Sequence, residues 1–451
     1  MLPAFDAPVW LRLDALANRA AWQPLLQLER AEFETVLGQP VNLDRPAAHE
    51  RATHVWDVVV DETSGCAKLE ADLHRRRMTL TLPGEEAFGA GINLLHSLAY
   101  SPATAVLDSE ADTYAEAFDR IHDEVANIYP YFELRGLDWD AITSRYRHVR
   151  ELVGDDFWDA ASQWVAELGD AHTQLIKPGA RFHPPYVAAM HGAGALLHHV
   201  PQDSAAWAAG VRPGHVVEVP EPSVWLHGVG ASPQHRAFVA ARRFMAMTTA
   251  ERQYTARAPD GTRHSWTELR TERPAVVARG NSIRITRFTP EVPALLRRAT
   301  ADADTDKPLT LDLRGNPGGD LVAAAEARRI FVRDDGPFGA VAFTTGRGTL
   351  GKPVHLTTAP ARDPWRGEVL VLVDAMTYSA AEDFLHPLVG CSHVTILGGP
   401  TGGGSGRPHT RRLIDGVTLA VSTAITYTRD GAPIEYRGIR PTATGTGGAV
   451  R

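Results

Sequence analysis

The final third of the chain alternates apolar strands with helices, and this alternation limits the possible folds more than any other feature. The segments 308–313, 369–373 and 394–397 are short apolar runs, and helical patterns follow the first two over 321–332 and from about Ala380. A further strand is predicted over 282–288 and a helix over 292–301. Strands that alternate with helices form right-handed crossovers in a mainly parallel sheet. The sequence therefore predicts an α/β core over 266–451.

Three other regions precede this core. Residues 1–105 mix a helical stretch over 10–33 with strands over 55–60 and 73–82, and they carry no recognisable chemistry. Residues 106–180 are predicted to be helical, because apolar residues recur every three or four positions from Tyr114 to Ile128 and helical patterns follow over 139–152 and 155–168. Residues 181–265 resemble a PDZ domain, with a small-residue helix before a glycine turn, although His215 stands where an acidic residue is usual. The whole chain is thus predicted to be a multidomain α/β protein.

Charge and cysteine content exclude several classes of function. A net charge of -8 argues against nonspecific binding to nucleic acid or to an anionic membrane, which would need a basic surface. The first residues lack the pattern of a secretory signal and no window reaches transmembrane length, so we expect a cytoplasmic protein without a membrane partner. Cys66 and Cys391 are the only cysteines, too few for a disulfide framework or a zinc site.

Two turns at the carboxyl ends of predicted strands could carry chemistry. One contains Ser379 at the start of a helix, at the sheet edge where α/β enzymes place reactive groups. Taken alone, Ser379 is better explained as a helix cap, with Glu382 three residues later completing a capping box. The other turn spans 312–320 and is rich in glycine, which leaves backbone N–H groups free to bind an oxyanion.

Together the two turns resemble the core motifs of the tail-specific, or C-terminal-processing, protease family. The resemblance rests on Arg-Gly-Asn-Pro-Gly-Gly at 314–319 and Thr-Tyr-Ser-Ala-Ala-Glu at 377–382, and it covers roughly 112–445. It implies a spiral βα core of the ClpP/crotonase type and a serine peptidase that works through an acyl-enzyme, with no metal and no organic cofactor. Ser379 would be the nucleophile. The oxyanion would be bound by backbone N–H groups of Gly318 or Gly319 and of Ala380.

The resemblance also indicates which base activates the serine. Where the Ser-Lys branch of the family has its lysine, this chain has the glycine-rich stretch 398–406, and no lysine follows Lys352. We therefore expect 401–406 to form a flexible loop beside the cleft that holds no base. The loop Leu-Gly-Asp-Ala-His-Thr at 168–173 is instead similar to the histidine loop of the tricorn-core branch, which makes His172 the base and Glu435 the residue that orients it.

Three positions depart from that branch. Ala171 stands where the tricorn-type site has a hydroxyl residue, and Tyr436 and Thr442 replace a common glycine and aspartate near Glu435. Because His172 and Ser379 are distant in sequence, the resemblance implies a site between two lobes that depends on their closure.

The resemblance implies a peptide or protein substrate, with its C-terminus recognised by strand addition to the PDZ-like module. Two alternatives stay open at this point. The first is a hydrolase or acyl transferase of the same mechanism that acts on a small peptide, ester or amide in a biosynthetic pathway. The second is a noncatalytic binding protein on the same fold, which the joint presence of Ser379, His172 and Glu435 disfavours.

Overall fold

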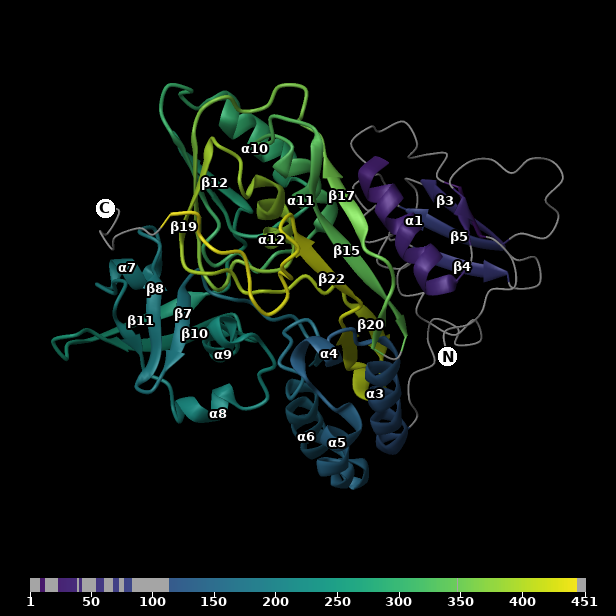
Figure 1. The fold of residues 1–451 in the computed structure, drawn as a ribbon. Helices are drawn as coiled ribbons and strands as arrows, with labels where there is room; N and C mark the ends of the chain where they lie inside the picture. The colour runs from purple at the N-terminus through teal and green to yellow at the C-terminus, as the bar shows by residue number, and fades with distance from the viewer. Residues whose placement is uncertain are drawn as a thin grey trace.

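The computed structural model describes residues 9–12, 23–38, 40–42, 54–60, 68–72, 77–82, 113–346 and 348–443. Both the boundary expected at 105/106 and Cys66 lie outside these residues. The described elements form four groups: an N-terminal sheet with α1, a helical lobe, a β-rich module and a large α/β core (Figure 1).

The N-terminal group contains a five-stranded sheet with the order β2-β1-β3-β5-β4. Its strands are β1 (Val9–Arg12), β2 (Val41–Asn42), β3 (His54–Val60), β4 (Lys68–Asp72) and β5 (Arg77–Leu82), and its helix is α1 (Gln23–Leu37). The helix predicted over 10–33 is wrong in its first part, because that part forms strand β1 in a parallel pairing with β3. The strand predicted over 55–60 is confirmed. The strand predicted over 73–82 is confirmed from residue 77, and its first four positions lie outside the described residues.

The helical lobe consists of α3 (Tyr114–Ile128), α4 (Phe132–Arg135), α5 (Trp139–Arg145), a 3₁₀ helix over Arg147–Glu151, and α6 (Gly154–Ala166). Thr113 caps α3 by accepting the Glu116 amide, and the predicted apolar stripe of α3 faces the core. Trp139 stacks on Trp164 with ring centroids 5.0 Å apart. The three predicted helices are confirmed, with the second divided into α5 and the 3₁₀ helix.

The β-rich module is one antiparallel sheet with the order β11-β10-β9-β8-β7. Its strands are β7 (Val187–His191), β8 (Gly194–His199), β9 (Val216–Val217), β10 (Glu251–Arg257) and β11 (Arg263–Leu269), and its helices are α7 (Ala205–Ala208), α8 (Pro222–Leu226) and α9 (Pro233–Met245). Strand β7 ends the sheet, and α9 packs against it (Figure 1).

The core contains the predicted α/β sheet, with the order β12-β13-β14-β18-β19. Its strands are β12 (Val276–Arg279), β13 (Ser282–Ile285), β14 (Leu309–Asp312), β18 (Val369–Val373) and β19 (Val394–Gly398), and its helices are α10 (Val292–Ala301), α11 (Leu321–Arg328) and α12 (Ala380–Leu385). All neighbouring strands are parallel except β12 and β13. The expectation of a mainly parallel βα sheet is confirmed, although α11 is shorter than its predicted range of 321–332.

A second set of strands joins the core to its neighbours. β15 (Gly336–Gly346) pairs with β16 (Thr349–Leu350), β17 (Val354–Thr358) and β22 (Ala424–Thr428), while β21 (Thr418–Val421) pairs with β20 (His409–Arg412) and β6 (Gln174–Ile176). Helix α1 packs against β15 and β17 (Figure 1). Leu413, Val417 and Leu419 are buried in the same apolar cluster as the helical lobe. The helical lobe and the end of the core therefore share one hydrophobic interior.

No helix in the described ranges combines the length and apolar character needed to cross a membrane.

Candidate active site

Ser379 occupies a strained turn between β18 and α12. Its backbone has φ 57° and ψ -128°, which a residue with a Cβ adopts only when its surroundings enforce it. Its amide donates to Glu382 Oε2 at 3.2 Å. Its Oγ points to an imidazole instead of serving only as a helix cap. A strained serine between a strand and a helix is the geometry of a nucleophile elbow.

The rest of this turn is fixed by hydrogen bonds to the glycine-rich turn that follows β14. Asp374 Oδ1 accepts the amides of Gly315, Met376 and Thr377 at 2.9–3.1 Å. Tyr378 donates its amide to the Asn316 carbonyl at 3.0 Å. The two motifs singled out in the sequence are therefore one bonded unit.

His172 meets Ser379 in the structure. Its Nε2 lies 3.0 Å from Ser379 Oγ, within the reach required of a general base. Burial lowers the pKa of His172, and the nearby Asp170 carboxylate only partly opposes this effect. The imidazole is therefore neutral near neutral pH, as a proton acceptor must be.

Asp170 and β6 hold the loop that carries His172. Asp170 accepts the His172 amide at 2.9 Å, the Thr173 hydroxyl at 2.7 Å and the Ser422 hydroxyl at 2.6 Å. Directly after the loop, β6 pairs with β21, with Leu175 opposite Leu419. The two lobes expected to close are thus already joined beside the site.

Glu435 makes no hydrogen bond to the His172 ring among the described residues, which corrects the direct orienting contact inferred for it from the sequence. Its carboxylate accepts from Arg135 Nη2 at 2.6 Å and from the Ser405 amide at 3.3 Å. Arg135 also donates to the carbonyls of Leu168 and Gly169, at 3.0 and 2.6 Å. Glu435 is therefore linked to the start of the histidine loop through the hydrogen bonds of Arg135.

Tyr378 occupies the position assigned to the orienting residue. Its hydroxyl lies 3.1 Å from His172 Nδ1. Its ring stacks on that of His235, with ring centroids 4.4 Å apart and planes 11° apart. The ring also contacts that of His172, with centroids 4.6 Å apart and a tilt of 31°. Burial raises the pKa of Tyr378 well above its ordinary value, so the phenol keeps its proton. Its position directly before Ser379 is the one signal in the sequence that could have indicated this role.

The oxyanion donors proposed from the sequence differ in their availability. The Gly318 amide already donates to Asn316 Oδ1 at 2.9 Å. Among the described residues, no hydrogen-bond acceptor pairs with the amide of Gly319 or of Ala380. A Cβ on Gly318 would lie 2.8 Å from Ser379 Cβ, so glycine is required there for the two turns to meet. Gly319 and Ala380 are the donors left free.

The loop 401–406 is buried, contrary to the expectation of a flexible loop beside the cleft. Glu382 accepts the amides of Gly403 and Gly404 at 2.9 and 2.8 Å and also binds the Thr401 hydroxyl. A Cβ on Gly404 would overlap the ring of Tyr378. The volume that a lysine would need at this position is therefore filled by Tyr378.

No group of three or more histidine, cysteine, aspartate or glutamate side chains could hold a metal ion in the part of the chain that the structure describes.

Comparison with known proteins confirms the resemblance seen in the sequence. The model of peptidase family S41 matches residues 281–444. A probable CtpA-like serine protease of Staphylococcus aureus is 29% identical over 164 residues, which are 36% of this chain and 32% of that protein. The match thus spans about a third of the length of this curated relative.

Two solved structures share the fold. The photosystem II D1 C-terminal processing protease matches with a TM-score of 0.52 and 18% identity, over 74% of this chain and 93% of its own. Mature CPAF matches with a TM-score of 0.55 and 13% identity, over 73% of this chain and 92% of its own. These likenesses extend the agreement in fold beyond the matched family domain.

Proposed function

Since residues 281–444 form a domain of peptidase family S41, we propose that this chain is a serine peptidase that cleaves peptide bonds through an acyl-enzyme on Ser379. The observation that carries the proposal is the 3.0 Å contact between Ser379 Oγ and His172 Nε2 at a strained serine turn. A helix cap would not need a positive φ, and a surface imidazole would not need to meet the serine.

In the proposed reaction, Ser379 Oγ attacks the scissile carbonyl carbon while its proton passes to His172 Nε2. The tetrahedral oxyanion is bound by the amides of Gly319 and Ala380. Collapse of this intermediate breaks the C–N bond, and His172 returns the proton to the leaving amine. Water then attacks the acyl-enzyme, with His172 accepting a proton from it and giving one back to Ser379.

Tyr378 and Asp170 support His172 in this scheme. A neutral imidazole with a free Nε2 lone pair carries its proton on Nδ1. This Nδ1–H donates a hydrogen bond to Tyr378 Oη in the proposed arrangement. When His172 becomes an imidazolium, the Asp170 carboxylate stabilises the new charge, because its field favours the protonated form. Glu435 is a positioning residue that acts through Arg135.

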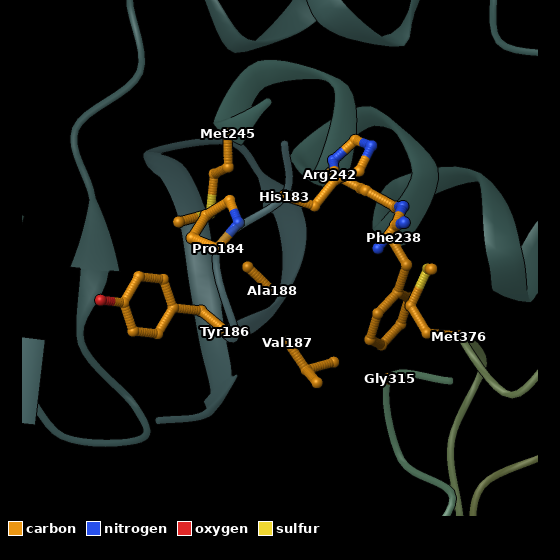
Figure 2. A pocket seen from close by; sticks show the side chains of 10 residues that line it. All are labelled: His183, Pro184, Tyr186, Val187, Ala188, Phe238, Arg242, Met245, Gly315 and Met376. Atoms are coloured by element: carbon orange, nitrogen blue, oxygen red, sulfur yellow. The ribbon is translucent and has the colours of Figure 1, made fainter. Parts of the chain in front are cut away.

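We further propose that the β-rich module is a PDZ-like peptide-binding module and that the core is of the spiral βα type. A pocket lies between Tyr186, Val187 and Ala188 at the start of β7, three side chains of α9, and the core residues Gly315 and Met376 (Figure 2). Because β7 is the last strand of its sheet, an extended peptide could pair with its edge and continue towards Ser379.

Covalent labelling tests the proposal. A fluorophosphonate is expected to label Ser379, and the protein is expected to cleave members of a peptide library. Ser379→Ala should abolish both activities, and His172→Ala should lower the labelling rate by at least about hundredfold. Glu435→Gln should reduce turnover less than Ser379→Ala does. Unchanged peptide cleavage by the Ser379→Ala protein would contradict the proposal.

A further inference from the structure

A cleft with a volume of about 970 Å³ lies between the β-rich module and the core. Its walls come from the segment before β7, the end of β8, strands β12 and β13, and the turn after β14. Pro317 lines it, and the next residue, Gly318, packs against Ser379. The cleft therefore reaches the glycine-rich turn that packs against the proposed nucleophile, although Ser379 itself does not line it.

The lining of this cleft is strongly cationic in a chain whose net charge is -8. Two aspartates line it, against seven arginines: Arg181, Arg242, Arg273, Arg279, Arg284, Arg287 and Arg314. Such a concentration of one sign of charge in a concave site raises the local concentration of ligands of opposite charge.

Four of these arginines already have carboxylate partners. Arg284 and Arg314 bind Asp312 at 3.4 and 2.9 Å. Arg279 binds Asp203 at 3.3 Å and Arg273 binds Glu268 at 2.7 Å. The pairs with Asp312 fix the cleft wall next to the glycine-rich turn.

The other three arginines, Arg181, Arg242 and Arg287, form no ion pair with any residue that the structure describes. Arg242 is partly buried. Burial without a counterion disfavours its charged form and lowers its pKa to about 10, so it remains a cation near neutral pH. Figure 2 shows it near His183 above the start of β7. Burial, with Arg242 adding to the effect, lowers the pKa of His183 to about 3.

We propose that this cleft binds an acidic segment of the peptide substrate and thereby directs the peptidase to substrates with several aspartate or glutamate side chains near the scissile bond. The inference rests on the proposed peptidase function and adds the substrate class. A single chain-terminal carboxylate would occupy one or two arginines, whereas three unpaired guanidinium groups and a volume of this size fit a segment with several carboxylates.

The test compares two fluorogenic peptides that share a scissile sequence and differ only in a flanking run, acidic in one and with the matching amides in the other. The wild-type protein is expected to cleave the acidic peptide with a kcat/KM at least about tenfold higher, and the ratio should shrink at high salt as the charges are screened. Flanks are tested on both sides of the scissile bond.

The variant Arg181→Glu/Arg287→Glu changes two exposed side chains and should bring the ratio to about one or below. The control Arg147→Glu/Arg362→Glu makes the same change in charge at two exposed arginines outside the cleft and should keep the wild-type ratio. Fluorophosphonate labelling of Ser379 in both variants shows that each has folded.

Binding separates this inference from the proposed function. Fluorescence anisotropy of both peptides with Ser379→Ala protein needs no catalysis, and tighter binding of the acidic peptide by about tenfold is expected. Equal binding overturns the acidic-segment inference even if both peptides are cleaved. Loss of binding on amidation of the peptide's C-terminus, without any effect of the side-chain charges, would also overturn it, in favour of a terminal carboxylate as the ligand. A third outcome is that the wild-type protein neither cleaves the peptides nor reacts with the fluorophosphonate, while the Ser379→Ala protein still binds the acidic peptide more tightly. This outcome would refute only the peptidase proposal.

Discussion

At the residue scale, we propose that the hydroxyl of Tyr378 orients His172, because it lies 3.1 Å from Nδ1. It is the only side-chain group hydrogen-bonded to His172 Nδ1 among the described residues. When the phenol oxygen accepts from Nδ1–H, the imidazole is held in the tautomer with a free Nε2. The phenol has no charge to offer the imidazolium. Its contribution is therefore orientation, with electrostatic stabilisation left to Asp170.

Tyr378→Phe should lower kcat by about tenfold to hundredfold and leave KM nearly unchanged. The ring would still fill the space between His172 and His235, so folding should be preserved. The control is Tyr427→Phe, which removes a half-buried hydroxyl away from the site. Steady-state kinetics on one peptide substrate measures both variants. A wild-type kcat in Tyr378→Phe would exclude the orienting role.

The pH dependence follows from the pKa of His172. Only the neutral imidazole can accept the serine proton, so activity is lost as pH falls through this pKa. Because burial lowers the pKa from its ordinary value of 6.5, the acid limb of kcat/KM should have its midpoint below pH 6.5. A profile of kcat/KM from acid to mildly alkaline pH measures it. A midpoint above pH 7 would contradict a buried, neutral base.

At the scale of the element, loop 401–406 has glycines packed against Tyr378 where the Ser-Lys branch of the family has its lysine. Its glycines lie against Tyr378 while Glu382 binds their amides, and burial raises the pKa of Glu382 to about 7. The same carboxylate also accepts the Ser379 amide. Helix α12, the serine turn and the loop are therefore bonded to one another through Glu382.

Gly404→Ala should lower both stability and activity, because its Cβ would overlap Tyr378 and displace the ring that orients His172. Overpacking of this kind costs about 1–3 kcal/mol. Gly399→Ala is the matched control, since a Cβ there meets nothing within 4 Å. Thermal unfolding and peptide cleavage are measured for both. Equal behaviour of the two variants would show that the loop can move away from Tyr378.

At the scale of the whole molecule, the N-terminal region is tied to the core near the site. Arg407 directly follows the loop 401–406 and binds Glu32 of α1 at 2.9 Å as well as Glu29. All three side chains are buried or nearly so, and Arg407 has a positive φ of 44°. The region without recognisable chemistry therefore supplies the counterions for a buried cation of the core.

Glu29→Gln/Glu32→Gln should lower the free energy of unfolding by about 3 kcal/mol, because it leaves Arg407 buried without a charged partner. Glu34→Gln, on the same helix, removes only a half-exposed pair with Arg30 and should cost less than about 1 kcal/mol. Denaturant unfolding compares the two. Equal losses would show that α1 does not depend on Arg407 for docking.

The sequence by itself determined the elements of the core and the two turns that carry its chemistry. Strand β18 and helix α10 lie where periodicity placed them, because a buried parallel strand must be apolar throughout and a surface helix must be apolar on one stripe. Ser379 and His172 were found through local motifs, since a nucleophile turn and a histidine loop are each specified by a few adjacent residues.

Only the tertiary structure decided which groups surround His172. Tyr378, Arg135 and Ser422 contact the histidine or its loop from three separate segments. Because these segments are far apart in the sequence, no local motif could indicate the contacts. Glu435 was placed on the imidazole by its motif, yet a buried carboxylate is most stable beside a buried cation, and Arg135 supplies one. The cationic cleft likewise exists only because folding gathers arginines that the sequence spreads from 181 to 314.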